Sequence, residues 1–250
     1  MIMNKVYAVS DLHGQYELWM QIKEFLSPSD TLICLGDCVD RGPSGFDILI
    51  EMLDRPNTIM LKGNHEALML QDYYTIKNHE MQVDPYSCLW FQNGGYDTYQ
   101  NIINCYGAKC VDMVFREVER LPITHIDSCN EKLIVLNHCG FTPGLPYDEL
   151  WDRYHLTDVW PEGYDNVYIV HGHTPVQHLW RKGVTMYSKG KGVYGTLSSA
   201  VDEVVTYCSG HKIDIDLGCF ATHKTCLLDL DTFEPIYFYG KDYINYENRN

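Results

Sequence analysis

The sequence predicts an α/β fold, because short apolar runs that suit buried strands alternate with segments of helical periodicity. Three such runs, 6–9, 31–35 and 58–61, are rich in aliphatic residues, and a loop of polar residues and glycines follows each of them closely. Between them, 16–25 and 46–53 carry apolar residues at helical spacing. The first third of the chain is therefore predicted to alternate strand and helix.

The rest of the chain is predicted to add a helical insertion and a second series of strands. Residues 67–121 have a mainly helical pattern that breaks at Asn93-Gly94-Gly95 and ends at Leu121-Pro122, as a small cap inserted in the sheet would. Five further strand-like runs follow at 132–136, 167–170, 212–215, 224–230 and 236–239. Within 179–210, a plain surface hairpin is favoured over a loop that gates substrate access. We expect one domain over residues 1–250, since α/β folds of this length often stay undivided.

Composition narrows the class of protein. The 250 residues are 45% hydrophobic and carry a formal net charge of −15, which argues against a broad nucleic-acid-binding or acidic-membrane surface. The N-terminus lacks the apolar stretch of a signal peptide, and no run reaches the roughly 18 apolar residues of a membrane span. Ten cysteines are scattered without a C-x-x-C pair, which favours reduced thiols. We therefore expect a cytoplasmic protein with no nucleic-acid or membrane partner.

Five short clusters of residues that can bind metal ions lie between Asp11 and His173, and each closely follows a predicted strand. They are Asp11-Leu12-His13-Gly14, Gly36-Asp37-Cys38-Val39-Asp40-Arg41-Gly42, Gly63-Asn64-His65-Glu66, Asn137-His138-Cys139-Gly140 and His171-Gly172-His173-Thr174. The first three occupy successive strand-to-helix loops, the edge at which open α/β sheets bind ligands. Asp, Asn and His side chains from several strand ends suit two bridged divalent cations beside a phosphate. The clusters therefore predict a two-metal phosphoesterase site.

In this order, the five clusters resemble the motifs of the phosphoprotein phosphatase family of binuclear metallophosphoesterases, especially its compact bacterial and phage serine/threonine phosphatases. The resemblance covers most of the chain. It implies a two-sheet β-sandwich flanked by helices, with the metal ions where the C-terminal loops of the strands gather. Pro175 after Gly172-His173-Thr174 favours the phosphatase branch, because related phosphodiesterases have a metal-binding His at that position.

The resemblance also implies a set of metal ligands. Asp11 and His13 would hold the first metal ion, and Asp37 would bridge both ions. The second ion would be held by Asn64, His138 and His173. Such a donor set accepts several divalent ions, of which Mn²⁺ is expected, with Fe²⁺ and Zn²⁺ as alternatives.

The same resemblance assigns catalytic roles, in which a hydroxide held between the metal ions attacks the phosphorus in line. His65 would protonate the leaving alkoxide, and Asp40 would orient His65. Arg41 would grip the phosphoryl oxygens, and so would Arg153, because Leu150-Trp151-Asp152-Arg153 resembles the family's Leu-Trp-x-Arg segment. Two alternatives stay open: His65 as a metal ligand or structural residue, and Arg153 as an ordinary surface arginine.

Other side chains of the clusters are less specific. His171 is expected to have a structural role, although it lies two residues from His173. Cys38 and Cys139 are either oxidation-sensitive thiols in the site loops or small packed side chains.

Three functions remain open. The favoured one is a phosphatase that hydrolyses phosphoserine and phosphothreonine in proteins and also small phosphate esters. The second is a bis(5'-nucleosyl)-tetraphosphatase, a dinucleoside polyphosphate hydrolase that shares the fold and the metal centre. The third is a catalytically silent phosphoprotein-binding scaffold, which the complete set of expected ligands disfavours.

Overall fold

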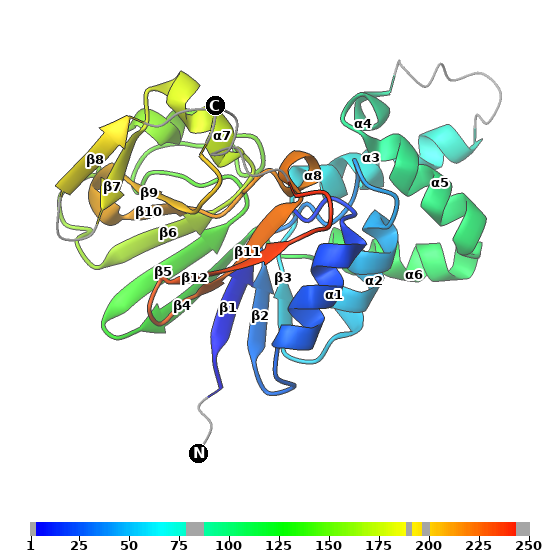
Figure 1. Cartoon of the computed structure of the whole chain (residues 1–250). Coiled ribbons are helices and arrows are strands. Elements are labelled where there is room, and N and C mark those ends of the chain that lie inside the picture. The colour runs from blue at the N-terminus through cyan, green and yellow to red at the C-terminus, as the bar shows by residue number, and fades with distance from the viewer. Residues whose placement is uncertain (1–3, 79–87, 189–191, 197–200, 244–250) are drawn as a thin grey trace.

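The protein is described from a computed structural model that covers residues 4–78, 88–188, 192–196 and 201–243 (Figure 1). Two β-sheets face each other, and helices flank one of them, so the predicted two-sheet sandwich is confirmed. All ten cysteines are free thiols. No helix in the described ranges is long and apolar enough to cross a membrane.

The first sheet has the strand order β12-β11-β1-β2-β3. Its strands are β1 (Val6–Val9), β2 (Thr31–Cys34), β3 (Thr58–Met60), β11 (Lys224–Asp229) and β12 (Pro235–Tyr239). Strands β1, β2 and β3 are parallel, whereas β11 is antiparallel to both β1 and β12. The C-terminal ends of the first three strands therefore lie at one edge of the sheet.

The second sheet has the order β4-β5-β6-β10-β9-β7-β8. Its strands are β4 (Thr124–Cys129), β5 (Lys132–Asn137), β6 (Val167–His171), β7 (Thr185–Ser188), β8 (Gly192–Thr196), β9 (Val205–Tyr207) and β10 (Lys212–Asp214). The parallel pairs β5–β6 and β6–β10 form its centre. Strands β7 and β8 pair antiparallel, as expected for the surface hairpin, while 189–191 and 197–200 lie outside the described residues.

The helices up to α6 follow the predicted order, whereas the short helices α7 and α8 were not predicted. They are α1 (Tyr16–Phe25), α2 (Gly45–Asp54), α3 (Asn64–Asn78), α4 (Leu89–Gln92), α5 (Gly95–Cys105), α6 (Ala108–Glu119), α7 (Val176–Leu179) and α8 (Cys219–Thr222), with short 3₁₀ turns at Tyr154–Thr157, Trp180–Lys182 and Cys208–Gly210. The predicted break at Asn93-Gly94-Gly95 separates α4 from α5, and α6 ends before Leu121-Pro122. Helices α3 to α6 extend away from the sheets beside α2 (Figure 1).

Period-two alternation along the central strands divides the core between the two faces of the first sheet. Leu32 and Cys34 on β2 pack into the cluster shared with the helices. Ile33 and Leu35 pack between the sheets, against residues such as Leu136 of β5. The apolar runs are therefore continuous because both faces of the strands are buried.

Candidate metal centre and active site

The five clusters come together at the C-terminal ends of strands from both sheets. The loops after β1 and β2 carry Asp11 and Asp37, and the turn after β3 carries Asn64 as the first residue of α3. His138 follows β5 and His173 follows β6. A hydrogen bond from the His173 N–H to Asp11 Oδ2, at 3.0 Å, joins the two sheets at this point. All five side chains, and that of His13, are buried.

The backbone of these loops is strained. Left-handed φ angles of 42° to 71° occur at non-glycine residues of the site, namely Asp11, His13, Asp37, Asp40, Arg41 and His173. Each such conformation costs on the order of 1–3 kcal/mol and persists only where the surroundings hold it. Such strain is concentrated at functional sites in proteins, and here it turns the side chains of the loops toward one another.

One group of donor atoms surrounds Asn64. Its Oδ1 lies 2.8 Å from His138 Nε2 and 2.8 Å from His173 Nδ1. The carboxylate of Asp37 completes the group, with Oδ2 3.4 Å from His138 Nε2. His138 Nδ1 faces the carbonyl oxygen of Leu35 at 3.1 Å, which leaves Nε2 available as a ligand atom.

The charges of this group favour a cation. Burial lowers the pKa of His138, but the neighbouring Asp37 carboxylate outweighs it and raises that pKa to about 10. Burial and the nearby His138 lower the pKa of His173, which keeps its imidazole neutral, as a metal ligand must be. The negative charge of Asp37 thus attracts a proton to His138 at the place where a divalent ion would be bound.

A second group of donor atoms also includes Asp37. His13 Nε2 lies 3.8 Å from Asp11 Oδ1 and 3.8 Å from Asp37 Oδ2. His13 Nδ1 is bound at 2.9 Å to the carbonyl oxygen of Val39, so Nε2 is the ring nitrogen that faces the other donor atoms. His13, Asp37 and His65 offer ligand atoms within 4.8 Å of one another, and so do Asp37, His138 and His173. Asp37 is the residue common to both groups.

This donor set fits two divalent cations of borderline hardness. It offers carboxylate, amide and imidazole atoms, and no thiolate of the described residues points into it. The thiol of Cys38 contacts Cys34 Sγ and Met52 Sδ, each at 3.4 Å, and Cys139 bonds to backbone carbonyls. The side chains of Cys38 and Cys139 are fully buried, which agrees with the packed-thiol alternative.

His65 belongs to the second of these groups and is held by Asp40. Its Nδ1 is 2.7 Å from Asp40 Oδ2, and its Nε2 is 3.8 Å from Asp37 Oδ2. The Asp40 carboxylate is fully buried. Because Nδ1 is taken by Asp40, only Nε2 faces the space between the donor groups.

Arg41 reaches the same space. The guanidinium of Arg41 lies 2.5 Å from His13 Nε2 and 2.9 Å from His65 Nε2. Arg153 is exposed, yet partial burial of its guanidinium, together with the charge of Arg41, lowers its pKa. The charges of Cys139 and Asp216 oppose that shift. Two residues earlier in the chain, the Trp151 ring has its centroid 5.9 Å from that of His173.

Two side chains, Glu66 and Trp90, make contacts that were not predicted from the sequence. Glu66 accepts the backbone N–H groups of Asp37, Cys38 and Gly63 at 2.8 to 3.0 Å. Trp90 donates its indole N–H to Asp40 at 2.8 Å. His171, in contrast, behaves as predicted: its Nε2 bonds to Tyr207 Oη at 2.7 Å and lies outside both donor groups.

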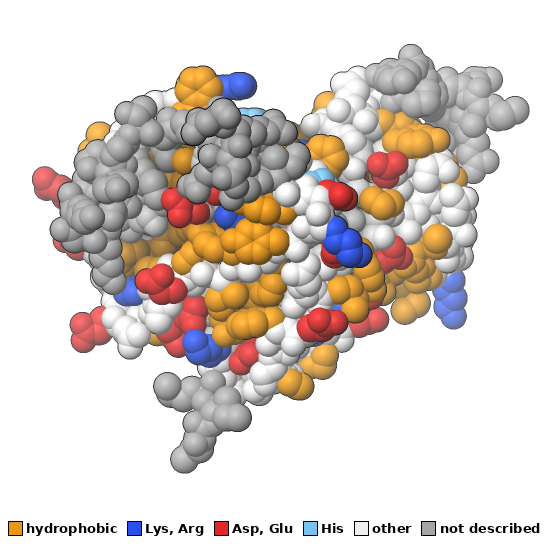
Figure 2. Space-filling model, viewed as in Figure 1, with side chains coloured by type: hydrophobic (Ala, Val, Ile, Leu, Met, Phe, Trp, Pro, Cys, Tyr) orange, Lys and Arg blue, Asp and Glu red, His pale blue; other side chains and the backbone are white. Residues whose placement is uncertain are grey.

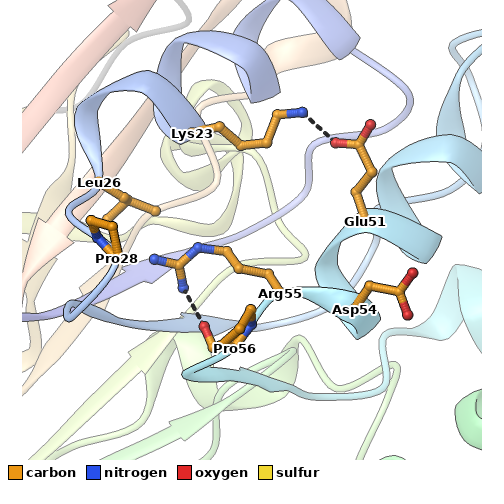
Figure 3. A pocket seen from close by; sticks show the side chains of 7 residues that line it. All are labelled: Lys23, Leu26, Pro28, Glu51, Asp54, Arg55 and Pro56. Atoms are coloured by element: carbon orange, nitrogen blue, oxygen red, sulfur yellow. Dashed lines mark hydrogen bonds and ion pairs between the residues drawn. The ribbon is translucent and has the colours of Figure 1, made fainter.

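A separate surface pocket of about 480 Å³ lies away from the metal-ligand loops. It is lined by Lys23, Leu26, Pro28, Glu51, Asp54, Arg55 and Pro56 (Figure 3). These residues lie at or just after the C-terminal ends of α1 and α2, shortly before β2 and β3 begin. The pocket is therefore at the N-terminal ends of these two strands, whereas the metal-ligand loops follow their C-terminal ends. Lys23 and Glu51 form an ion pair, and Arg55 donates to backbone carbonyls. The pocket therefore contributes nothing to the candidate active site.

The charged side chains form no broad patch on the face shown in Figure 2. There, the described Lys and Arg side chains are scattered among Asp and Glu. Any attraction for an anionic substrate on this face must therefore act locally.

The fold and the two donor groups that share Asp37 define a phosphoesterase hydrolase with a candidate binuclear metal site. Residues 4–177 match the family model described as calcineurin-like phosphoesterase. The chain therefore belongs to the calcineurin-like phosphoesterase family.

Curated relatives include enzymes with two kinds of substrate. Serine/threonine-protein phosphatase 2 of Escherichia coli (strain K12) is 28% identical over 145 residues, which are 57% of this chain and 61% of the relative. Serine/threonine-protein phosphatase 1 of Salmonella typhimurium is 27% identical over 204 residues, 76% of this chain and 88% of the relative. The symmetrical bis(5'-nucleosyl)-tetraphosphatase of Salmonella paratyphi A is 27% identical over 141 residues, 55% of this chain and 43% of the relative. The chain thus spans less than two thirds of the length of the first and third of these proteins.

Solved structures share the fold at low identity. A putative diadenosine tetraphosphatase superposes with a TM-score of 0.56 at 16% identity, covering 96% of both chains. A protein serine/threonine phosphatase from Saccharomyces cerevisiae gives the same TM-score at 14% identity, covering 97% of this chain and 82% of the other.

Proposed function

We propose that this protein is a metal-dependent phosphomonoesterase that hydrolyses phosphoserine and phosphothreonine in proteins. The observation that carries the proposal is the sharing of Asp37 by two groups of donor atoms, one of which includes His65, itself hydrogen-bonded to Asp40. A phosphorylated protein or a small phosphate ester would be the substrate.

Six residues would hold two divalent ions, with Mn²⁺ proposed as the activating metal. They are Asp11, His13, Asp37, Asn64, His138 and His173. Bound there, the two cations supply Lewis acidity to the phosphoryl oxygens and activate the attacking water. Asp37 would contribute its carboxylate to both sites.

The remaining chemistry falls to side chains of the chain itself. Arg41 and Arg153 bind the non-bridging oxygens, where a planar guanidinium offers two parallel hydrogen bonds and stabilises the charge of the transition state. His65 donates the proton on Nε2 to the leaving oxygen as the phosphorus–oxygen bond breaks. Asp40 keeps the other ring nitrogen engaged, so that Nε2 points toward the substrate.

The His65–Asp40 pair supports a phosphomonoester as substrate. The alkoxide of serine or threonine is a poor leaving group and needs a proton donor, whereas a nucleotide leaving from an anhydride needs little help. A dinucleoside tetraphosphatase is the second candidate, favoured by the relative from Salmonella paratyphi A.

Parallel turnover assays on a phosphoserine peptide and on diadenosine tetraphosphate test the proposal, with metal-depleted protein supplied with Mn²⁺. We expect kcat/KM for the peptide to exceed that for the dinucleotide by at least about 100-fold. The reverse order would assign the protein to dinucleotide hydrolysis, and the absence of turnover on both would favour a binding role.

A further inference from the structure

The segment of α4 and α5 makes three hydrogen bonds to the dipeptide Asp40-Arg41. Trp90 Nε1–H donates to Asp40 Oδ1 at 2.8 Å, and the Asp40 N–H donates to Thr98 Oγ1 at 2.7 Å. The N–H of Arg41 donates to the carbonyl oxygen of Gly94 at 2.9 Å. Asp40 and Arg41 have φ angles of 71° and 64°, so these bonds hold a strained part of the loop after β2.

We propose that the α4–α5 segment positions the proton donor, and that Trp90 is the residue that orients the Asp40 carboxylate toward His65. The inference rests on the proposed function, because it requires His65 to protonate a leaving group. Trp90 does not touch the substrate in this account; it acts through Asp40.

The geometry of the carboxylate supports this role. Oδ2 of Asp40 binds His65 Nδ1 at 2.7 Å, and Oδ1 binds the indole of Trp90. The last side-chain torsion of an aspartate is soft, so one hydrogen bond alone leaves the carboxylate free to rotate. The second bond fixes its plane, and through it the direction in which His65 Nε2 points.

Trp90 is itself held firmly. Its side chain is fully buried, and its backbone N–H donates to Asp72 Oδ2 at 3.0 Å. The rings of Tyr73 and Tyr99 lie against it, with centroids 6.5 and 6.3 Å away. The indole is therefore a rigid donor.

The glycines of the Asn93-Gly94-Gly95 break let the segment approach this closely. A Cβ at Gly95 would lie 2.3 Å from the Trp90 indole, and one at Gly94 would lie 2.9 Å from Arg41 Cγ. Gly94 also has a φ of 96°, which disfavours a side chain there. Glycine at these two positions therefore lets the segment between α4 and α5 pack closely against Arg41 and the Trp90 indole.

The test is the dependence of turnover on the leaving group in Trp90→Phe, which removes the N–H and keeps a buried ring. Phenyl phosphate, a poor leaving group, is compared with 2,4-dinitrophenyl phosphate, a good one, and metal content is measured for every variant. We expect kcat for phenyl phosphate to fall by about 10- to 100-fold, with less than about threefold change for the dinitrophenyl ester. His65→Asn serves as the reference for complete loss of the proton donor.

Trp19→Phe is the matched control. Trp19 is also fully buried and donates its indole N–H to a carboxylate, Glu51 Oε2, at 2.7 Å. Glu51 lines the pocket in Figure 3, away from the metal-ligand loops, so the loss of this bond should leave the leaving-group dependence unchanged. If Trp90→Phe does not fold, Thr98→Val removes the acceptor of the Asp40 N–H and is measured in the same way.

The outcomes separate the inference from the function on which it rests. Two results would overturn the inference alone. In the first, kcat depends more steeply on the leaving group in His65→Asn but not in Trp90→Phe. In the second, Trp90→Phe lowers kcat equally for both esters. No steepening in His65→Asn would remove the proton donor from the proposed function, and the inference with it. In an Asp40→Asn background, we expect Trp90→Phe to lower kcat for phenyl phosphate by less than about threefold. A decrease as large as in the wild-type background would show that Trp90 does not act through Asp40.

Discussion

Glu66 Oε2 accepts the backbone N–H of Asp37 at 2.8 Å, and this bond fixes the residue that both donor groups share. The other carboxylate oxygen accepts the N–H of Cys38 at 2.8 Å, while Oε2 also accepts that of Gly63 at 3.0 Å. Glu66 is fully buried, and burial together with the charge of Asp37 raises its pKa to about 7. One side chain therefore ties the loop after β2 to the turn after β3.

The Glu66→Gln variant should weaken metal binding. In glutamine, an NH₂ group replaces one of the two acceptor oxygens. This group cannot accept a hydrogen bond from the backbone N–H donors, so the loop that carries Asp37 is held less firmly. We expect an affinity for Mn²⁺ lower by about 10- to 100-fold, the range found when groups that support metal ligands are altered. Competition with a fluorescent chelator measures it. Glu51→Gln, which alters a carboxylate bonded to Tyr16 and Trp19, is the control, and equal affinities in the two variants would contradict the role of Glu66.

The thiols of the site loops should be unreactive in the folded protein. The Cys38 and Cys139 side chains are fully buried, and burial raises the pKa of Cys139 to about 12. Cys105 is exposed and provides an internal reference. After brief treatment with iodoacetamide at pH 8, peptide mass spectrometry should find Cys105 alkylated and both loop cysteines unmodified. Labelling of Cys38 as fast as that of Cys105 would revive the oxidation-sensitive alternative.

A buried lysine holds the segment that carries Arg153. Lys212 Nζ donates to Thr142 Oγ1 at 2.7 Å and to the carbonyl oxygen of His155 at 2.6 Å. Burial lowers its pKa from 10.5 to about 8. Between these values the unfolded chain holds a proton that the folded protein lacks, so this group makes the free energy of unfolding rise with pH.

The Lys212→Met variant should lose that rise. Other titrating groups are common to both proteins, so the difference between their stability curves isolates Lys212. From pH 8 to pH 10 we expect the free energy of unfolding of the wild type to gain on the order of 1–2 kcal/mol over that of the variant, measured by urea denaturation. Parallel curves would show that Lys212 does not change its protonation on unfolding in this range.

The sequence predicted the metal-ligand clusters because each is local: a few residues that follow a strand end. The carboxyl ends of the parallel strands β1, β2 and β3 then bring Asp11, Asp37 and Asn64 to one edge without further information. The contact of Trp90 with Asp40 could not be predicted in this way, because it joins residues 50 positions apart. It depends on how α4 packs against α3 and α5, which no spacing within a motif reveals.

The strands that were missed differ from those that were predicted. Strand β4 (Thr124–Cys129) pairs with β5 alone and keeps its side chains exposed or half-buried, so its sequence contains His, Asp and Ser instead of an apolar run. Strand β9 (Val205–Tyr207) has only three residues. Both segments are strands because they pair with a neighbouring strand, and neither has the apolar pattern by which a strand is predicted from sequence.

We propose that Asp37 is shared by two bound cations. Mn²⁺ titration of metal-depleted protein, followed by elemental analysis and by turnover of 4-nitrophenyl phosphate, tests it most directly. We expect two ions per chain in the wild type, fewer than two in Asp37→Ala, and turnover that requires both ions. Full turnover in chelated protein, or two tightly bound ions in Asp37→Ala, would contradict it.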